Sequence, residues 1–221
     1  MNVVLLGLPG AGKGTQAQRL KEGGLVHITT GELFRENIRQ GTELGKQAQP
    51  FYDRGDLVPN ELTIGMLLDR LRQPDTANGC LFDGYPRNLQ QAVALDEALT
   101  SEGKAIDQAI YFKVDEEELV KRLAGRWNCP NCATVYHETN QPPKVAGICD
   151  NCGTALAQRA DDSPDVVRNR LEVNLKNLRP LLDHYRRQDK LLEIDGDRDP
   201  EQVHQDLRHL IFGDDADAAV A

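Results

Sequence analysis

Residues 7–15 read GLPGAGKGT and stand between a short apolar run and a stretch with helical periodicity. A strand, a glycine-rich turn and a helix in this order form a phosphate cradle, because the glycines let backbone N–H groups point inward and the helix N-terminus favours an anion. The lysine of this pattern reaches the β and γ phosphates of a nucleotide. We therefore expect nucleotide phosphates to be bound by Gly10, Ala11, Gly12, Lys13, Gly14 and Thr15.

The rest of the chain switches repeatedly from short apolar runs to longer amphipathic stretches, which predicts a parallel sheet flanked by helices. The expected strands are residues 2–7, 25–28, 80–83, 109–114 and 191–195. The expected helices are residues 14–21, 31–39, 43–53, 60–72, 88–101, 116–124, 164–187 and 200–211. The pattern indicates an α/β fold of the P-loop NTPase type with a five-stranded parallel sheet.

Two segments interrupt this alternation. Residues 126–160 are rich in Cys, Pro, Gly and Asn and poor in aliphatic residues, which indicates an insertion with its own scaffold. In residues 29–59, two or three short helices replace a single crossover, which suggests a second, mobile lobe. The small, acidic tail 214–221 is expected to be disordered.

Composition limits the classes of protein to consider. The 221 residues include 35 acidic and 26 basic ones, for a formal net charge of −9, which repels nucleic acid and anionic membranes over most of the surface. No run approaches the ~20 apolar residues of a membrane span, and the N-terminus lacks the pattern of a signal peptide. We expect a cytoplasmic protein with no nucleic-acid or membrane partner.

Four of the five cysteines form two tight pairs, Cys129/Cys132 and Cys149/Cys152, separated by sixteen residues. This is zinc-ribbon spacing, and four thiolates complete a tetrahedral shell, so the pattern predicts a structural metal ion. Zinc is expected, although thiolates also bind iron or cobalt. The alternatives are a reduced tetrad without metal and two local disulfides. Cys80 is expected to be a buried core residue.

A second anion site follows the expected strand at residues 80–83, in CLFDGYPRNLQQ (residues 80–91). Asp83 ends that strand at the sheet edge where open α/β folds bind ligands, and it is placed to hold the waters of Mg²⁺. Arg87 suits a phosphate on a second nucleotide, and Gln91, one helical turn later, could read a base. The alternative for Asp83 is a plain helix cap.

These motifs together resemble the adenylate kinase family of nucleoside monophosphate kinases. The hydroxyl comes at Thr15, after Gly14, whereas most GTPases and motor ATPases place it directly after the lysine. The family's P-loop is similar to residues 7–16, its monophosphate-binding lobe to HITTGELFR (27–35) and its DG(F/Y)PR motif to residues 83–87. GRWNCPNCATVYH (125–137) is similar to the lid of the zinc-containing, long-lid subgroup, and the resemblance extends to about Phe212.

The resemblance implies an activity and a domain division. The implied reaction is reversible, Mg²⁺-dependent transfer of the terminal phosphoryl group of ATP to AMP, giving two ADP, by a monomer that serves adenine nucleotide homeostasis and AMP salvage. The implied domains are a core (1–28, 59–124 and 163–213), a helical NMP-binding domain (29–58) and a zinc-ribbon-like LID domain (125–162).

The resemblance also implies site residues. Besides the P-loop, ATP is expected to contact Arg126, Val135, Tyr136 and Arg198. AMP is expected to contact Thr30, Arg35, Asp56, Leu57, Val58, Gly84, Tyr85, Pro86, Arg87, Gln91, Arg159 and Arg170. The expected catalytic residues are Lys13, Asp83, Arg87, Arg122, Arg126, Arg159 and Arg170, since phosphoryl transfer needs positive charge spread over the moving group.

Two other functions are compatible with parts of the sequence. A UMP or CMP kinase would share the P-loop and the DGYPR-like motif, although such enzymes typically have a shorter lid. A zinc-ribbon nucleic-acid-binding module would use the P-loop only as a nucleotide switch, and the net charge of −9 argues against it.

Overall fold

The structure is a computed structural model of the chain, and it describes residues 1–20, 24–54, 56, 58–132, 134–158 and 164–213. Side chains at positions 164–166, 169 and 170 fall outside this description. Within the described residues, no helix combines the length and apolarity that crossing a lipid bilayer requires.

In the described part of the chain, five strands form one parallel sheet in the order β2-β3-β1-β4-β7. They are β1 (Val3–Leu6), β2 (Val26–Thr29), β3 (Cys80–Asp83), β4 (Gln108–Lys113) and β7 (Leu191–Asp195). All five strands predicted from the sequence are confirmed, with ends that differ by one residue at most. The apolar runs pair side by side because each buries both faces in the core.

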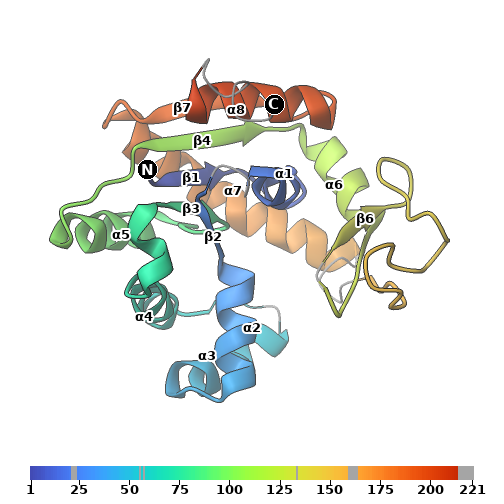
Figure 1. The fold of residues 1–221 in the computed structure, drawn as a ribbon, viewed down its shortest axis with the longest axis horizontal. Helices are drawn as coiled ribbons and strands as arrows, with labels where there is room; N and C mark the ends of the chain where they lie inside the picture. Colours follow the sequence, from blue (N-terminus) through green and yellow to red (C-terminus); the bar gives the residue numbers. More distant parts are fainter. Residues whose placement is uncertain (21–23, 55, 57, 133, 159–163, 214–221) are drawn as a thin grey trace.

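Helices cover both faces of this sheet (Figure 1). Val3 and Leu5 of β1 face a cluster that includes α1 (Lys13–Arg19), α6 (Glu116–Ala124) and α8 (Pro200–Phe212). Val4 and Leu6 face the opposite cluster, which includes α4 (Asn60–Leu71) and α5 (Leu89–Ser101). The long helix α7 (Pro164–Arg186) contributes to both clusters. Alternating side chains of β1 therefore anchor both helical layers.

Strand order determines where a ligand can bind. From β1 the chain runs to β2 and β3 on one side of the sheet, and then to β4 and β7 on the other. The connections therefore diverge beside β1 and leave a crevice at its carboxyl end, the point at which open α/β sheets bind ligands. The glycine-rich loop after Leu6 occupies this point.

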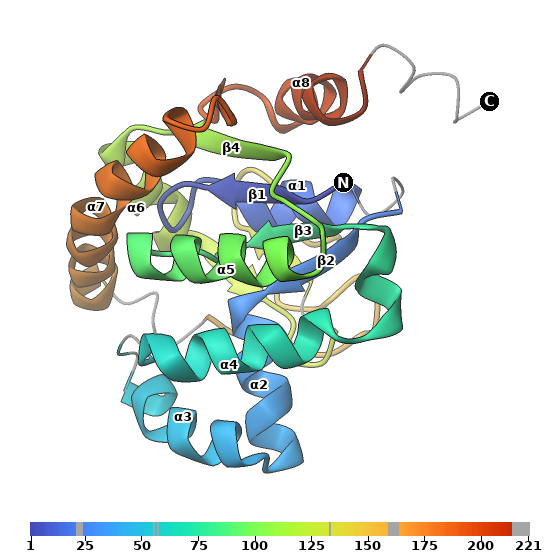
Figure 2. The ribbon, with the colours of Figure 1, turned by 90° about the vertical axis from the view of Figure 1, so that its left-hand side faces the viewer.

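The first insertion is helical and has its own small core. Helices α2 (Thr30–Gln40) and α3 (Glu43–Arg54) pack with the start of α4, and Figure 2 shows them at the end of the molecule away from α8. Their shared cluster contains Phe34, Ala48, Val58 and Met66. The turn between the helices uses Gly41, whose φ of 65° is accessible to glycine at a helix C-terminus.

The second insertion is a small antiparallel sheet of β5 (Arg126–Asn128) and β6 (Val135–His137), on the side of the core away from α5 (Figure 1). Its buried cluster consists of Cys129, Tyr136 and Cys149, with Trp127 and Leu156 packed against it. So few apolar side chains cannot stabilise a fold alone, which explains why the segment needs another source of stability. A short 3-10 helix, η2 (Pro74–Asn78), precedes β3.

The close approach of α2 and α3 depends on Gly45, because a Cβ there would lie 2.2 Å from the backbone oxygen of Asn37. We predict that Gly45→Ala lowers the free energy of unfolding by about 2 kcal/mol, as overpacking typically does. The matched control is Gly65→Ala in α4, whose Cβ would meet only the flexible side chain of Leu44 at 3.2 Å. This control should be neutral or stabilising, by up to about 1 kcal/mol. Equal effects of the two substitutions in chemical denaturation would contradict the packing argument.

Candidate active site

A cleft of about 710 Å³ opens at the carboxyl edge of the sheet. One wall is the glycine-rich loop and the start of α1, and another is the segment after β3 with the start of α2. The remaining walls come from α6, β5, β6, α7, the loop after β7 and the start of α8. The lining includes Gly10, Ala11, Gly12, Lys13, Gly14, Thr15, Thr30, Arg35, Asp83, Gly84, Pro86, Arg87, Arg122, Arg126, Val135, Tyr136 and Arg198. Most of the predicted site residues therefore meet in one space.

The glycine-rich loop adopts the backbone geometry that the sequence predicts. Gly10 and Gly12 have φ values of 88° and 89°, in the left-handed region that favours glycine. Gly12 caps α1 without a side-chain hydrogen bond, and the N-terminus of a helix favours an anion. Lys13 Nζ donates to the carbonyl oxygens of Gly7 (2.8 Å) and Leu8 (2.9 Å), which curls the lysine along the loop.

Asp83 lies beside the start of α1. A Cβ at Gly14 would come within 3.3 Å of Asp83 Oδ2, so a serine or threonine there would crowd the carboxylate. The Asp83 side chain is 13% exposed and lies 3.4 Å from His27 Nε2 on the neighbouring strand β2. Sequence reasoning missed His27, because the pairing of β2 with β3 cannot be read from either segment alone.

Arg87 is held against the start of α2. Its Nε donates to Gly84 O (2.9 Å) and its Nη2 to Thr30 Oγ1 (3.1 Å), while the Thr30 hydroxyl donates to Gly84 O (3.1 Å). The N-cap of α2 is Thr29, whose hydroxyl accepts from Glu32 N at 3.0 Å, and Thr30 is the first helical residue. Thr30 is thus left to face Arg87 and the cleft.

Other residues expected at the second nucleotide have varied surroundings. Arg35 folds over Gly31, whose added Cβ would lie 3.1 Å from Arg35 Nη1. Asp56 pairs with Arg54 (2.7 Å), and Val58 is buried in the core of the helical insertion. Leu57 and Arg159 lie outside the described residues, as does the side chain of Arg170.

Tyr85 and Gln91 are buried beside Arg87. Tyr85 is fully buried and its hydroxyl donates to Gln91 O at 3.1 Å, and this burial raises the pKa of the phenol. Gln91 is 4% exposed, and its Oε1 accepts from the backbone N–H of Arg87 at 2.8 Å. The amide of Gln91 is therefore part of the support of Arg87, a role that the sequence analysis did not anticipate.

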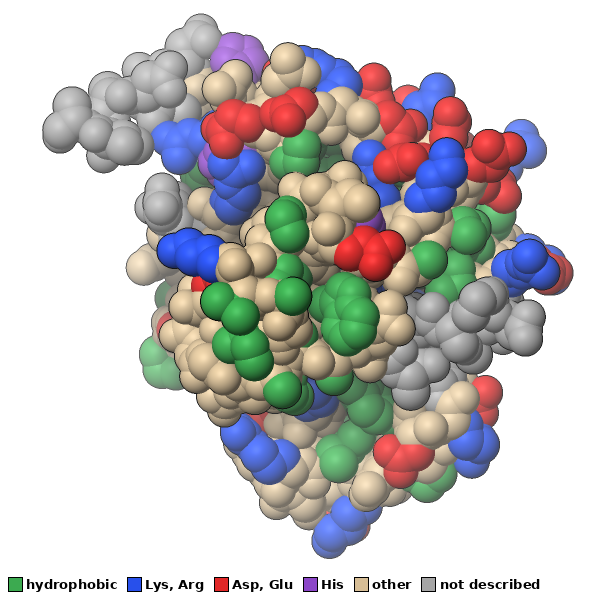
Figure 3. Space-filling model, turned by 90° about the vertical axis from the view of Figure 1, so that its right-hand side faces the viewer, with side chains coloured by type: hydrophobic (Ala, Val, Ile, Leu, Met, Phe, Trp, Pro, Cys, Tyr) green, Lys and Arg blue, Asp and Glu red, His purple; other side chains and the backbone are tan. Residues whose placement is uncertain are grey.

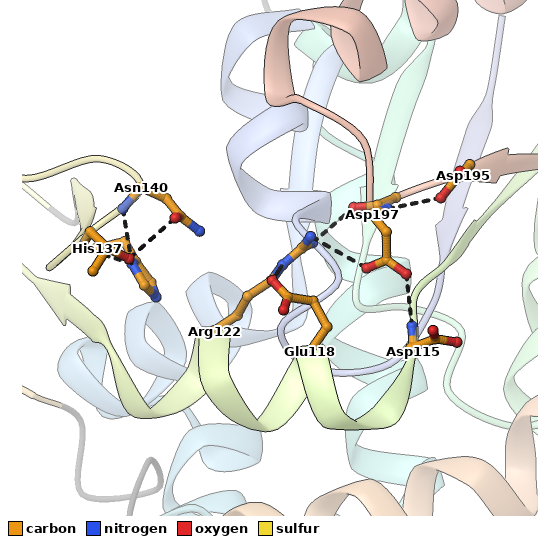
Figure 4. Close-up of polar contacts among 9 residues, drawn as sticks. Asp115, Glu118, Arg122, His137, Asn140, Asp195 and Asp197 are labelled. Atoms are coloured by element: carbon orange, nitrogen blue, oxygen red, sulfur yellow. Dashed lines mark hydrogen bonds and ion pairs between the residues drawn. The ribbon is translucent and has the colours of Figure 1, made fainter.

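On the opposite side of the cleft, Arg122 is tied to two carboxylates (Figure 4). Its Nε donates to Glu118 Oε1 (2.9 Å), its Nη1 to Gly196 O (2.8 Å), and its Nη2 lies 3.4 Å from Asp197 Oδ1. Asp197 also accepts from the backbone N–H of Asp115 (3.1 Å). The loop after β7 is thereby fastened to α6, and the partners Glu118 and Asp197 are further residues that sequence reasoning missed.

The other residues predicted to contact ATP all line the cleft, and some of them also have partners elsewhere in the protein. Arg126 and Val135 line the cleft from β5 and β6. Tyr136 lines it too, but its hydroxyl lies 3.5 Å from Cys149 Sγ and accepts from Asp150 N at 2.8 Å. Arg198 lines the cleft while its Nη1 pairs with Asp206 of α8 at 2.5 Å.

All five cysteines are free thiols, and the two pairs of the insertion converge as the spacing predicted. The four Sγ atoms lie within 4.8 Å of one another, with separations of 3.3 Å (Cys129–Cys152) and 3.4 Å (Cys132–Cys149) among them. A tetrahedral ion bound by thiolates at about 2.3 Å would place the sulfurs about 3.8 Å apart. The tetrad therefore fits a four-coordinate metal ion, and local disulfides are excluded.

The two halves of the tetrad are alike. Cys129 N donates to Thr134 O, and Cys149 N donates to Thr154 O, both at 2.9 Å. The threonine hydroxyls lie 3.1 Å and 3.3 Å from the sulfurs of Cys132 and Cys152. Hydrogen bonds from Thr154 lower the pKa of Cys152 to about 5, whereas removal from water raises the pKa of Cys129 to about 11. Such outer hydrogen bonds orient thiolates for a metal.

The fold and the site together define a class. A P-loop at the switch point of a parallel sheet faces an arginine-bearing segment across one cleft, which is the arrangement of a nucleotide-binding phosphotransferase.

Comparison with known proteins gives the family. The family model described as adenylate kinase matches residues 5–190. Curated proteins named adenylate kinase are similar along nearly the whole chain. The one from Oceanobacillus iheyensis is 50% identical over 212 residues, and the one from Geobacillus sp. (strain WCH70) is 49% identical over 214; each alignment covers 96% of this chain and 99% of the relative. The one from Staphylococcus aureus (strain Mu50) is 48% identical over 212 residues, and this alignment covers 96% of this chain and 99% of the relative. The chain belongs to the adenylate kinase family.

The tetrad leads to a prediction about metal content. We expect the purified protein to contain about one metal ion per chain and Cys132→Ser to reduce this to background, because three thiolates leave the shell open. Thermal unfolding of the variant should begin at a lower temperature, since metal binding supplies folding free energy. Elemental analysis by mass spectrometry measures the metal content, and calorimetry measures the thermal unfolding. Cys80→Ala, outside the tetrad, is the control and should keep its metal; a variant Cys132→Ser that also kept it would contradict the assignment.

Proposed function

We propose that the protein transfers the terminal phosphoryl group of ATP reversibly to AMP, with Mg²⁺, giving two ADP, and thereby serves adenine nucleotide homeostasis and AMP salvage. The observation that carries this proposal is the pairing of β1 with β3, which brings the P-loop and Arg87 to the same cleft. Two phosphate-bearing ligands bound there would meet end to end.

The donor side is the P-loop. The backbone N–H groups of residues 10–15 would hold the β and γ phosphates of ATP at the N-terminus of α1. Lys13 is already curled along this loop and would exchange its carbonyl partners for phosphate oxygens. Arg126, Val135, Tyr136 and Arg198 would contact the rest of ATP, with Arg198 first releasing Asp206.

The acceptor side is the segment from Asp83 to Arg87 together with the start of α2. Arg87 would bind the AMP phosphate with the guanidinium that Thr30 and Gly84 already orient, and Arg35 would bind it from the opposite side. The other residues that we propose on this side are Asp56, Leu57, Val58, Tyr85, Pro86, Gln91, Arg159 and Arg170. This orientation of the guanidinium by the protein would lower the entropy cost of binding.

The cleft also fits Mg²⁺. This ion prefers oxygen ligands and retains several waters, and the largely buried Asp83 carboxylate lines the cleft beside the start of α1. Bound Mg²⁺ would neutralise charge on the β and γ phosphates of ATP. Asp83 would hold its waters, and His27 would support the orientation of Asp83.

The two insertions would act as lobes that close over the core. We propose the domains as residues 29–58 for the NMP-binding lobe, 125–162 for the LID and the remainder through 213 for the core. Closure would bring Arg122, Arg126, Arg159 and Arg170 over the transferring group and exclude water, which is the competing acceptor. Arg122 would enter this arrangement from its ion pairs with Glu118 and Asp197.

In the LID, we propose zinc as the ion of the cysteine tetrad, in a structural role, because four thiolates leave no position for water. Free thiols of this kind persist in a reducing compartment, so we place the protein in the cytoplasm. We further propose a monomer, because residues of a single chain form both sides of the cleft.

A nucleic-acid-binding function receives no support from the surface around the LID. On the face that Figure 3 shows, blue basic side chains of the described residues lie in separate places, with red acidic side chains among them. A binding site for a phosphate backbone needs a concentration of positive charge.

We predict that Arg87→Ala lowers the turnover number about 100-fold or more, as expected when a charged donor that positions the attacking AMP phosphate is removed. Circular dichroism should show an unchanged fold. The control is Arg72→Ala, an exposed arginine on the surface that pairs with Asp69, which should retain turnover within about twofold. Turnover of Arg87→Ala close to that of the unmodified protein would contradict the proposed acceptor site.

A further inference from the structure

The carboxamide of Asn60 lies at the centre of a chain of hydrogen bonds beside Arg87. Asn60 is the first residue of α4, directly after the helical insertion. Its Oδ1 accepts from Gln91 Nε2 (2.8 Å) and from Asn88 Nδ2 (3.0 Å), and its Nδ2 donates to Gln90 Oε1 (2.7 Å). Through one oxygen, Asn60 therefore joins the start of α4 to two residues at the start of α5.

Backbone groups fix the direction of this chain at both ends. Asn88 caps α5 by accepting from Gln91 N (3.0 Å) through Oδ1, so its Nδ2 must be the atom that donates to Asn60. At the other end, the backbone N–H of Arg87 can only donate, and it requires Gln91 Oε1 as its acceptor (2.8 Å). Flipping the side-chain amide of Gln91, Asn88 or Asn60 would leave two donors, or two acceptors, facing each other.

The consequence concerns Gln91. Both atoms of its amide have one hydrogen-bonding position beyond those just described, a lone pair on Oε1 and an N–H on Nε2. Adenine carries an amino donor where guanine carries an oxygen acceptor, so the orientation of a glutamine amide decides which base it matches. The Oε1 atom is turned toward the backbone of Arg87, a residue that lines the cleft.

We propose that Asn60 is a positioning residue that holds the amide of Gln91 in the orientation suited to adenine, and so sets the preference for AMP over GMP. This inference rests on the proposed function, in which Gln91 reads the base of AMP. Gln91 is 4% exposed, so the amide cannot be reoriented by solvent, and Asn60 is the side chain that holds its Nε2 end. Asn60 itself acts through Gln91 and need not touch the nucleotide.

The experiment compares phosphorylation of AMP and GMP by the unmodified protein and by three variants. Asn60→Ala removes the acceptor for Gln91 and Asn88. Asn60→Asp keeps an oxygen in that place but loses the donor to Gln90. Gln90→Ala removes the exposed end of the chain and leaves the orientation of Gln91 untouched. Thermal unfolding of each variant controls for the fold.

We expect Asn60→Ala to lower the ratio of kcat/KM for AMP to that for GMP about tenfold, the effect of one lost hydrogen bond, mainly through a higher KM for AMP. Asn60→Asp and Gln90→Ala should keep the ratio of the unmodified protein. An unchanged ratio in Asn60→Ala would overturn the inference. So would a loss of selectivity in Asn60→Asp equal to that in Asn60→Ala, a comparison that remains decisive if the alanine variant is less stable.

The outcome separates this inference from the proposed function. If the unmodified protein does not phosphorylate AMP, the proposed function fails, and the inference fails with it. If the unmodified protein prefers AMP and the variants do not differ from it, the inference about Asn60 alone is wrong.

Discussion

The backbone N–H groups at the start of α1 need an acceptor that the side chain of their own cap does not supply, because Gly12 has none. A phosphate group would satisfy them, and the rest of the architecture places this helix end at the carboxyl edge of β1, between strands that lead away on both sides. Because the two helical layers pack on alternating residues of β1, the core that stabilises the fold also fixes the position of the proposed anion site.

The positive side chains are concentrated at the same end of the sheet as the start of α1. A chain with a net charge of −9 can attract a polyphosphate only where positive groups are concentrated, and Lys13, Arg35, Arg87, Arg122 and Arg126 all line one cleft. Several of these groups have protein partners, namely carbonyl oxygens for Lys13, Thr30 for Arg87, and Glu118 with Asp197 for Arg122. Nucleotide binding would therefore exchange one set of hydrogen bonds for another.

Much of this could be predicted from the sequence, for reasons that lie in local patterning. Apolar runs located all five strands, the glycines located the loop, and the repeated C-x-N-C spacing located the tetrad. What the sequence could not show depends on contacts between segments: the approach of His27 to Asp83, the hydroxyl of Tyr136 on Cys149, and the chain of amides from Asn60 to Arg87. The cap of α2 at Thr29 was ambiguous because two threonines stand together, and only the backbone geometry distinguishes them.

The central claim is that one cleft holds two nucleotides and passes a phosphoryl group directly between them. The most direct test is a coupled assay of ADP formation from Mg-ATP, with AMP, UMP, CMP and GMP offered separately as acceptors. We predict rapid ADP formation with AMP and little with the other three. Faster turnover with UMP or CMP would agree with direct transfer within one cleft but would contradict AMP as the acceptor. ATP hydrolysis with no transfer to any monophosphate would contradict the claim itself.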